Sequence, residues 1–394
     1  NAVVMDSLRD KVDSLCIPPH AGEFEALGAA WFARSRRSRI NLDTSRLFRT
    51  ERSSFSYLPP IRSGRSMVAF KELTRAAVGE GDECILGLDV GSTTTKAVLL
   101  RVSDNALCGS VYLRTNGDPV QASRNCYRAL AEQAATEPAI TGLAVTGSGR
   151  RIAGLHAKTD AIINEIIAHA TGAAHYDPRV DTIFEIGGQD AKYTYLTNGV
   201  PSDYAMNEAC SAGTGSFLEE SARESLGIDY REIERIAVRG ESPPNFNDQC
   251  AAFISSDIKT ATHEGIGRED ITAGLVYSIC MNYVNRVKGQ RKVGSRIFMQ
   301  GGVCYNSAVP LAMANLIGRP IVVPPEPGLT GAFGVALELK NRIRDGLARK
   351  RSFRLTELAE RGIEHGKSFV CKGGKEKCDR GCEINMLIID GKKY

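Results

Sequence analysis

Three glycine-containing loops, each placed directly after a short apolar segment, constrain the fold of this chain more than any other feature. The first follows the apolar run at 84–89, and the chain then returns as a second apolar run at 97–100. This pattern predicts a hairpin whose tip presents backbone N–H groups and hydroxyls to phosphate oxygens. The phosphate-contacting residues expected there are Gly91, Ser92, Thr93, Thr94 and Lys96. Asp89, at the strand end, is expected to hold Mg²⁺ through water.

The other two loops extend the same pattern. In the second, Gly187 and Gly188 permit close backbone approach to phosphate, and Gln189 or Asp190 is expected to orient an attacking water. In the third, Gly301 and Gly302 end a strand and open a helix, as expected for an adenosine pocket. A single glycine turn between strands is usually structural, but three in this order and spacing predict one nucleotide site.

The periodicity of apolar residues from Cys84 onward is that of an α/β protein. Strands are expected at 84–89, 96–101, 141–145, 181–186, 191–196, 296–300 and 320–323. Helices are expected at 119–136, 159–172, 214–225, 229–236, 251–263, 267–288, 306–317 and 329–347.

With these loops and elements, the chain resembles the acetate kinase/sugar kinase/Hsp70/actin superfamily. The resemblance implies two ribonuclease-H-like subdomains with an ATP cleft between them. Subdomain I would comprise about 84–178 and 329–349, and subdomain II about 179–328. ATP or ADP would contact the loop residues named above, with Asp89, Gln189 and Asp190 at the reacting phosphate.

Two cysteines stand at expected helix starts. Cys210 precedes the turn Gly213-Thr214-Gly215, and Cys250 precedes the helical stretch at 251–263. A helix N-terminus lowers the pKa of a thiol and favours negative charge nearby. Two thiolates per chain cannot complete a four-sulfur site, so a [4Fe-4S] cluster would need a second chain or repeat. The alternative is that both cysteines are buried packing residues.

The segments around Cys210 and Cys250 resemble the cluster-ligand motifs of the ATPase activators of 2-hydroxyacyl-CoA dehydratases and benzoyl-CoA reductases (BadF/BadG/BcrA/BcrD ATPase family). The resemblance covers residues 84–345 and implies an ATPase coupled to electron transfer, with a [4Fe-4S] cluster held by Cys210 and Cys250. It implies Gly213, Thr214 and Gly215 as cofactor-binding residues. A low-potential electron would pass to an iron-sulfur dehydratase or reductase component, with ferredoxin or flavodoxin as the reductant.

One departure concerns Glu185, which stands where compact activators commonly have Asp. The loop sequence of this chain, with Glu185 before the two glycines, is more similar to that of large members of the family, which carry two ATPase copies in one polypeptide. The cluster would then be shared either in a homodimer or with a second ATPase repeat of the full-length chain.

An internal repeat of domain-sized period supports such a second copy. Pro18-Pro19, Gly22, Gly28 and Ala30 have the same spacing as Pro324-Pro325, Gly328, Gly334 and Ala336. Residues 1–33 are therefore expected to be the C-terminal tail of a preceding ATPase repeat, in a chain that begins inside a domain.

Three further segments complete the expected organisation. The Arg- and Ser-rich stretch 34–83 is expected to be a basic linker, with a docking strip for an acidic partner as the alternative. A bilobal ATPase follows at 84–349, and then a truncated segment at 350–394. Its three cysteines are either metal ligands that lack a fourth or free thiols: Cys371, Cys378 and Cys382.

Two lesser patterns have structural explanations. Glu165 and His169 share a helix face at i,i+4, which is expected to be a helix-stabilising pair at the domain junction, because a metal site would need a third ligand. The cysteines in apolar or periodic surroundings are expected to be packing residues: Cys84, Cys108, Cys126, Cys280 and Cys304.

Composition narrows the function classes. The net charge of +4 does not favour nucleic acid as a partner, and the chain has no apolar run of the ~20 residues that a membrane span needs. Scattered cysteines, odd in number, without a secretory leader indicate a cytoplasmic protein. The rival functions are an N-acetylhexosamine-type small-molecule kinase on the same fold, and a non-redox ATPase regulator.

Overall fold

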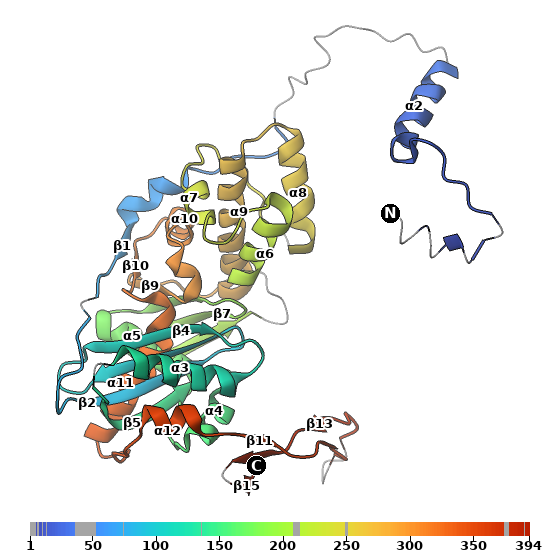
Figure 1. Ribbon diagram of the computed structural model, residues 1–394. Coiled ribbons are helices and arrows are strands. Elements are labelled where there is room, and N and C mark those ends of the chain that lie inside the picture. The colour runs from blue at the N-terminus through green and yellow to red at the C-terminus, as the bar shows by residue number, and fades with distance from the viewer. Residues whose placement is uncertain are drawn as a thin grey trace. The chain divides into compact units, whose positions relative to one another are not determined.

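The computed structural model describes residues 5, 8–9, 11–12, 14–35, 53–73, 75–134, 136–207, 213–248, 251–373, 378–389 and 391–394. The chain divides into two compact units, Asn1–Ser53 (unit 1) and Ser54–Tyr394 (unit 2). Unit 1 contains the 3-10 turn η1 (Ala21–Glu23) and the helix α2 (Phe24–Ser35), and no residue of α2 is buried. All three glycine loops belong to unit 2 (Figure 1).

Lobe I of unit 2 is a four-stranded sheet in the order β4-β3-β2-β5. Its central strand β2 pairs antiparallel with β3 and parallel with β5. Leu86 and Leu88 pack with α3, α4 and α12 on one face, whereas Ile85 packs with α5 and α11 on the other. Because helices cover both faces, β2 is apolar along most of its length. The bounds are β2 Glu83–Val90, β3 Thr94–Arg101, β4 Leu107–Arg114, β5 Ala139–Thr146, α3 Pro119–Gln133, α4 Arg150–Ala157, α5 Glu165–Tyr176, α11 Thr330–Arg344 and α12 Leu355–Glu360.

Lobe II is a six-stranded sheet in the order β1-β10-β9-β6-β7-β8. Here β6 pairs antiparallel with β7 and parallel with β9, so it repeats the pairing of β2 in lobe I. The helix α9 is buried from Ile271 to Asn282 and continues as the π-helical turn η4. The bounds are β1 Val68–Phe70, β6 Thr182–Ile186, β7 Ala191–Thr197, β8 Val200–Met206, β9 Ile297–Gln300, β10 Ile321–Val323, α6 Gly215–Leu226, α7 Ile233–Ala237, α8 Ala251–His263, α9 Arg268–Asn282, α10 Ala308–Ile317, η3 Ile61–Met67, η4 Tyr283–Lys288, η5 Gly302–Tyr305 and η6 Pro327–Leu329.

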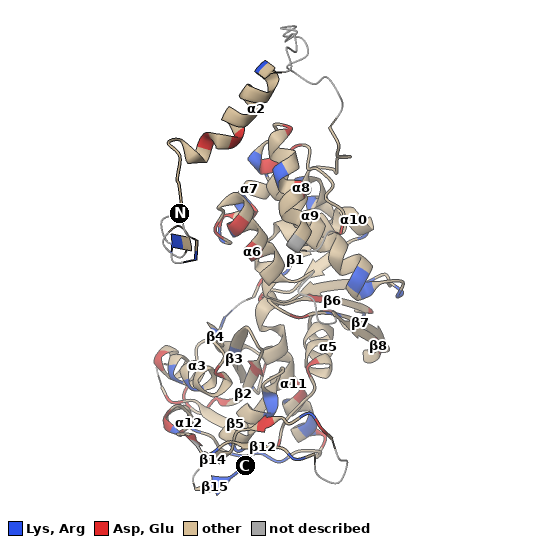
Figure 2. Cartoon of the chain, turned by 90° about the vertical axis from the view of Figure 1, so that its right-hand side faces the viewer, with Lys and Arg blue, Asp and Glu red and all other residues tan. Residues whose placement is uncertain are grey.

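The helix α5 connects the two lobes (Figure 2). Ala168 belongs to the core of lobe I, whereas Ala170 and Ala173 pack with Ile183 and Phe298 of lobe II. Asn164 caps the helix, because its side chain accepts a hydrogen bond of 2.8 Å from the backbone N–H of Ile166. Polar residues on α5 are therefore held at the junction of the two sheets.

The strands expected from the sequence are confirmed, and β1, β4 and β8 are additional. The helix expected at 159–172 is wrong in its first half. Lys158 takes a left-handed conformation with φ 56° and ends α4, and α5 begins at Glu165. The intervening segment instead forms a β-bridge from Ile162 to Val145.

The expected linker at 34–83 differs from the structure in its second half. From Ser54 onward the chain belongs to unit 2, where Ile61 is fully buried and β1 pairs in parallel with β10. At Gly64 a Cβ would lie 2.4 Å from the carbonyl oxygen of Leu311, so a glycine is needed for η3 to approach α10. The sequence did not predict this packing, because the few apolar residues of the segment are surrounded by arginines and show no periodic pattern. Residues 36–52 lie outside the described residues.

The C-terminal segment begins with α12, whose Leu355 and Leu358 are buried against lobe I. In the described part of the chain, the rest of this segment forms short strands only. The remaining bounds are β11 Glu364–His365, β12 Phe369–Val370, β13 Glu383–Ile384, β14 Leu387–Ile389 and β15 Lys392–Lys393.

Unit 1 repeats a local structure of unit 2. η1 and α2 in unit 1 follow each other as η6 and α11 do in unit 2, at the offset that relates the sequence repeat. The difference is burial: the first ten residues of α11 include nine that are buried or nearly so, whereas Trp31 of α2 is 75% exposed. Across the described residues, no helix is both long and apolar enough to cross a membrane.

Candidate functional site

The loop between β2 and β3 carries a buried ion pair. Asp89 lies at the end of β2, and its Oδ2 is 3.2 Å from Nζ of Lys96 on β3. Burial by itself raises the pKa of Asp89, but the charges of Lys96 and His169 outweigh it, so the net pKa lies below the ordinary value. Asp89 is thus an anion whose surroundings leave no room for larger neighbours. A Cβ at Gly147 or Gly331 would lie 2.6 Å or 2.8 Å from its carboxylate oxygens.

The loop between β6 and β7 approaches the first loop from lobe II. A Cβ at Gly188 would lie 3.1 Å from Cγ2 of Thr93, so the two loops approach each other closely at this glycine. At Gly187 a Cβ would lie 2.8 Å from the carbonyl oxygen of Asp190, which closes the turn. The backbone N–H of Gly187 donates to that same oxygen over 2.8 Å.

A small polar cavity of about 50 Å³ lies between the two loops. Every predicted residue of both loops lines it: Asp89, Gly91, Ser92, Thr93, Thr94, Lys96, Gly187, Gly188, Gln189 and Asp190. Six further residues line this cavity: Gly147, Ser148, Glu165, His169, Glu185 and Lys192.

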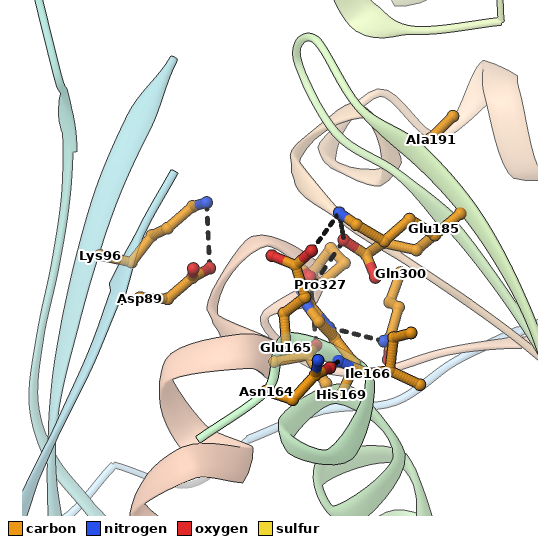
Figure 3. A network of polar contacts seen from close by, with 12 residues as sticks. Asp89, Lys96, Asn164, Glu165, Ile166, His169, Glu185, Ala191, Gln300 and Pro327 are labelled. Atoms are coloured by element: carbon orange, nitrogen blue, oxygen red, sulfur yellow. Dashed lines mark hydrogen bonds and ion pairs between the residues drawn. The ribbon is translucent and has the colours of Figure 1, made fainter. Parts of the chain in front are cut away.

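Glu165 and His169 reach lobe II from α5 (Figure 3). Oε1 of Glu165 is 3.9 Å from Nζ of Lys192, and Nε2 of His169 is 3.3 Å from Oε1 of Glu185. Nδ1 of His169 is 2.8 Å from Nε2 of Gln300 on β9. Glu165 and His169 therefore lie at the domain junction as expected, but the expected pairing of the two along the helix is wrong, because each side chain has its partner on the other lobe. The i,i+4 spacing was visible in the sequence, but its partners were not.

The charges of this network are nearly buried. Nζ of Lys192 donates to Oε1 of Glu185 over 3.2 Å. Burial raises the pKa of Glu185, but the charges of His169 and Lys192 lower it by more, so the net pKa is below 4.5. For Lys192, burial lowers the pKa, but Glu185 and Glu165 raise it by more. Glu185 is thus ionised at neutral pH, and an oxygen ligand of this kind suits Mg²⁺.

A second cavity of about 450 Å³ adjoins the first and shares Thr93, Thr94 and Gly188 with it. The rings of Tyr112 and Tyr305 meet edge to face in its lining, with centroids 5.9 Å apart. Its walls come from both lobes, from strand β4 of lobe I and from α6, α7 and η5 of lobe II. Volume and aromatic lining suit a flat heterocycle with its sugar. Predicted residues that line it beyond the shared ones are Gly215 and Gly302.

The other lining residues of the larger cavity were not predicted. Arg114 of β4 pairs with Glu219 of α6 across the lobes, at 3.3 Å. Tyr112 belongs to the same strand, and the sequence gave no signal for it because β4 itself was missed. Glu234 was also missed, and it binds the backbone N–H and the hydroxyl of Ser307 at the start of α10.

Three predicted cofactor-binding residues are not in the lining of either cavity: Gly213, Thr214 and Gly301. Gly301 has φ 98°, and a Cβ there would lie 2.3 Å from the carbonyl oxygen of Ile186. Gly213 has φ 80°, and a Cβ there would lie 3.0 Å from the backbone nitrogen of Tyr283. These glycines shape the backbone behind the cavity walls.

The proposed cluster ligands Cys210 and Cys250 lie outside the described residues. Described residues beside them both contact η4: Gly213 packs on Tyr283, and the carbonyl oxygen of Asp248 accepts a hydrogen bond of 3.1 Å from Arg286. Among the described residues, no three His, Cys, Asp or Glu side chains are grouped so that they could hold a metal ion.

Most of the other cysteines are packing residues as predicted. Cys84, Cys126, Cys280 and Cys304 are buried, and burial raises the pKa of the Cys84 and Cys126 thiols to about 12. Cys108 is half-buried. In the C-terminal hairpin the backbone N–H of Cys371 donates to the carbonyl oxygen of Cys382 over 2.7 Å, and Cys378 is exposed.

Known proteins share this architecture. The 2-hydroxyisocaproyl-CoA dehydratase activator of Clostridioides difficile is 33% identical over 253 residues, which are 64% of this chain and 93% of that protein. A solved structure of the activator of the 2-hydroxyisocaproyl-CoA dehydratase from Clostridium difficile, with bound ADPNP, has a TM-score of 0.61 at 31% identity. The matched region covers 67% of this chain and 96% of the chain in that structure.

A second solved structure, component A of the Acidaminococcus fermentans (R)-2-hydroxyglutaryl-CoA dehydratase, has a TM-score of 0.58 at 26% identity and covers 66% of this chain and 99% of its own. Both likenesses confirm the expected actin/Hsp70/sugar-kinase type of fold. The model of the BadF/BadG/BcrA/BcrD ATPase family matches residues 86–339, which contain both cavities and all three glycine loops. From this match and these likenesses, the chain belongs to the BadF/BadG/BcrA/BcrD ATPase family.

Proposed function

We propose that this chain is an ATP-driven activator that delivers a low-potential electron to an iron-sulfur dehydratase or reductase of the 2-hydroxyacyl-CoA or benzoyl-CoA type. The observation that carries the proposal is the pair of adjoining cavities, one polar and charged and one aromatic, in a member of this ATPase family. Their relative sizes and linings match a nucleotide whose phosphates end between the two glycine loops.

In the proposed arrangement the base and sugar occupy the larger cavity, near Tyr112 and Tyr305. The phosphates extend past Thr93 and Gly188 into the smaller one. Asp89 would hold Mg²⁺ through water, which fits a buried carboxylate that stays ionised. Lys96 offsets part of the charge at that carboxylate, and Gln189 or Asp190 would orient the attacking water.

The electron carrier in this proposal is a [4Fe-4S] cluster held by Cys210 and Cys250, and the cluster supplies one-electron chemistry when it is bound. Two thiols per chain require two more, from a homodimer or from a second ATPase repeat. Ferredoxin or flavodoxin would reduce the protein. Residues 1–33 would be the C-terminal part of such a repeat, because η1 and α2 follow each other as η6 and α11 do.

The test is anaerobic purification followed by iron and sulfide assays on the wild type, Cys210→Ala and Cys16→Ala. Cys16 is an exposed thiol of unit 1 and serves as the matched control. We expect about two irons per chain in the wild type and in Cys16→Ala, because a four-iron cluster is shared between two sites, and almost none in Cys210→Ala. Binding of ATP should persist in all three proteins.

Absence of oxygen-labile iron from the wild type would overturn the electron-transfer part of the proposal. ATP-dependent phosphorylation of an N-acetylhexosamine in place of simple hydrolysis would instead establish the kinase reading.

A further inference from the structure

The segment that precedes the first glycine loop lies against the edge of each sheet. At lobe II, β1 pairs in parallel with β10 (Figure 1), and the backbone N–H of Lys71 donates to the carbonyl oxygen of Val323 over 2.9 Å. At lobe I, Arg75 forms a parallel β-bridge with Leu107 on the edge strand β4, and the backbone N–H of Ala76 donates to the carbonyl oxygen of Leu107 over 3.2 Å. The backbone therefore holds Arg75 beside lobe I, ahead of the region that matches the family model.

The side chain of Arg75 extends this contact to lobe II. Its Nη1 donates to Oγ of Ser110 on β4 over 2.6 Å, and its Nη2 donates to Oε1 of Glu326 over 2.7 Å. Glu326 lies between β10 and η6, and its Oε2 accepts a hydrogen bond of 2.8 Å from the hydroxyl of Tyr305 at the end of η5. In the described part of the chain, Arg75 and Tyr305 are the hydrogen-bonding partners of this carboxylate. Burial and the bond to Glu326 raise the pKa of Tyr305, so its hydroxyl remains protonated and donates.

Tyr305 is at the same time part of the aromatic wall of the larger cavity. It meets Tyr112 there, which lies two residues after Ser110 on β4 and therefore on the same face of that strand. A Cβ at Gly328 would lie 2.6 Å from Cε2 of each tyrosine, so both rings rest against the backbone. The ring of Tyr305 is nevertheless 47% exposed, because its other side faces the open cavity. Its hydroxyl bond to Glu326 is thus the contact that fixes the orientation of an otherwise exposed ring.

From this relay we infer that Arg75 is a positioning residue for the nucleotide base: through Glu326 it fixes the ring of Tyr305 against which the base packs. The inference rests on the proposed function, in which the base occupies the larger cavity. A ring that is held in place before binding gives a higher affinity, since ordering a free side chain on binding costs free energy. Arg75 lines neither cavity, so it acts through Glu326 and Tyr305.

The test is a double-mutant cycle in the full chain. Dissociation constants for Mg·ADP are measured by titration calorimetry for the wild type, Arg75→Ala, Tyr305→Phe and the double variant, and KM and kcat for ATP hydrolysis are measured in parallel. Arg354→Ala is the matched control, because Arg354 forms a pair of similar exposure with Glu137, at 3.0 Å, and lines neither cavity. The pair of Arg75 with Glu326 is itself partly exposed, so its loss should not prevent folding.

We expect Arg75→Ala to raise the dissociation constant about threefold to tenfold, the range that corresponds to ordering one free side chain on binding. KM for ATP should rise by the same factor while kcat stays unchanged, because the reacting phosphate lies in the other cavity. Tyr305→Phe keeps the ring and breaks the same relay, so the double variant should bind no more weakly than the weaker single variant. Arg354→Ala should bind as the wild type does.

Two results would overturn the inference: an unchanged affinity in Arg75→Ala, or effects of the two substitutions that multiply in the double variant. If Arg75→Ala does not fold, Glu326→Gln decides by the same cycle with Tyr305→Phe, because it removes the charge that binds Arg75. Absent iron in the holoprotein would overturn the electron-transfer proposal and leave this inference standing. Absent binding of Mg·ADP in the wild type would overturn both.

Discussion

At the residue scale, the site is governed by carboxylates that are buried and yet charged. Asp89 and Glu185 are each 10% or less exposed, and each has a lysine partner at 3.2 Å. Removing one partner of such a pair is costly, because the other charge is left buried without compensation. Asp89 and Glu185 are therefore expected to stabilise the folded protein as well as to line the smaller cavity.

Glu185→Gln should lower the free energy of unfolding at neutral pH by about 3 kcal/mol, since Lys192 would keep only Glu165 as a charged partner. The folded pKa of Glu185 lies below its ordinary value of 4.5, so its contribution to stability is complete above pH 4.5 and is lost as the pH falls below it. Thermal unfolding from pH 7 to pH 3.5 should show the gap between wild type and variant narrowing at acid pH.

The control for this prediction is Glu232→Gln, which removes an exposed pair with Arg235 and should leave the melting temperature almost unchanged. A gap between wild type and Glu185→Gln that stays constant down to pH 3.5 would contradict the assigned protonation state.

At the element scale, the same local sequence forms one buried helix and one exposed helix. In α11, a Cβ at Gly334 would lie 1.8 Å from the carbonyl oxygen of Ala168, so the glycine lets α11 and α5 pack at backbone contact. In α2, the corresponding Gly28 has nothing within 4 Å. The repeat also exchanges Gly331, which abuts Asp89 and His169, for Glu25.

Gly334→Ala should destabilise unit 2 by about 3 kcal/mol, because the added methyl cannot be accommodated without separating α11 from α5. Gly28→Ala should leave the unfolding of unit 2 unchanged and favour α2 by about 1 kcal/mol through helix propensity. Thermal unfolding and circular dichroism of the two variants provide the measurement. Equal destabilisation by both substitutions would show that α2 is packed as α11 is.

At the scale of the whole molecule, the compact unit that contains the two cavities begins at Ser54, well before the first glycine loop. The segment from Ser54 supplies the buried Ile61 and the edge strand β1. It also supplies the carbonyl oxygen of Pro59, which accepts a hydrogen bond of 2.8 Å from the hydroxyl of Tyr277. Acidic and basic residues are interspersed over both lobes of this unit (Figure 2).

A chain of residues 54–394 should unfold at the melting temperature of unit 2 in the full chain and bind ATP with the same affinity. A chain of residues 71–394 should melt about 5–10 °C lower, because it loses the burial of Ile61 and the pairing of β1. Calorimetry and nucleotide titration of the two deletions measure this. Equal melting temperatures would restore the linker interpretation for residues 54–70.

The sequence by itself predicted most strands of the two sheets and the three loops that follow them, because strand periodicity and glycine turns are local properties. It predicted that Asp89, Gly187 and Gln189 would lie together, from their place at or just after strand ends, and all three line the smaller cavity. It did not predict the partners of Glu165 and His169, since these come from β6, β7 and β9 and meet α5 only in the folded lobes.

The tertiary structure alone decided which residues close the site. Tyr112 and Arg114 contribute because β4 lies at the edge of lobe I that faces α6 and η5. Residues 54–70 join lobe II because apolar side chains among the arginines, Ile61 and Val68, pack in its core. In each case the contact joins segments that are far apart in the chain. A local pattern of residues does not identify a contact partner that is distant in sequence.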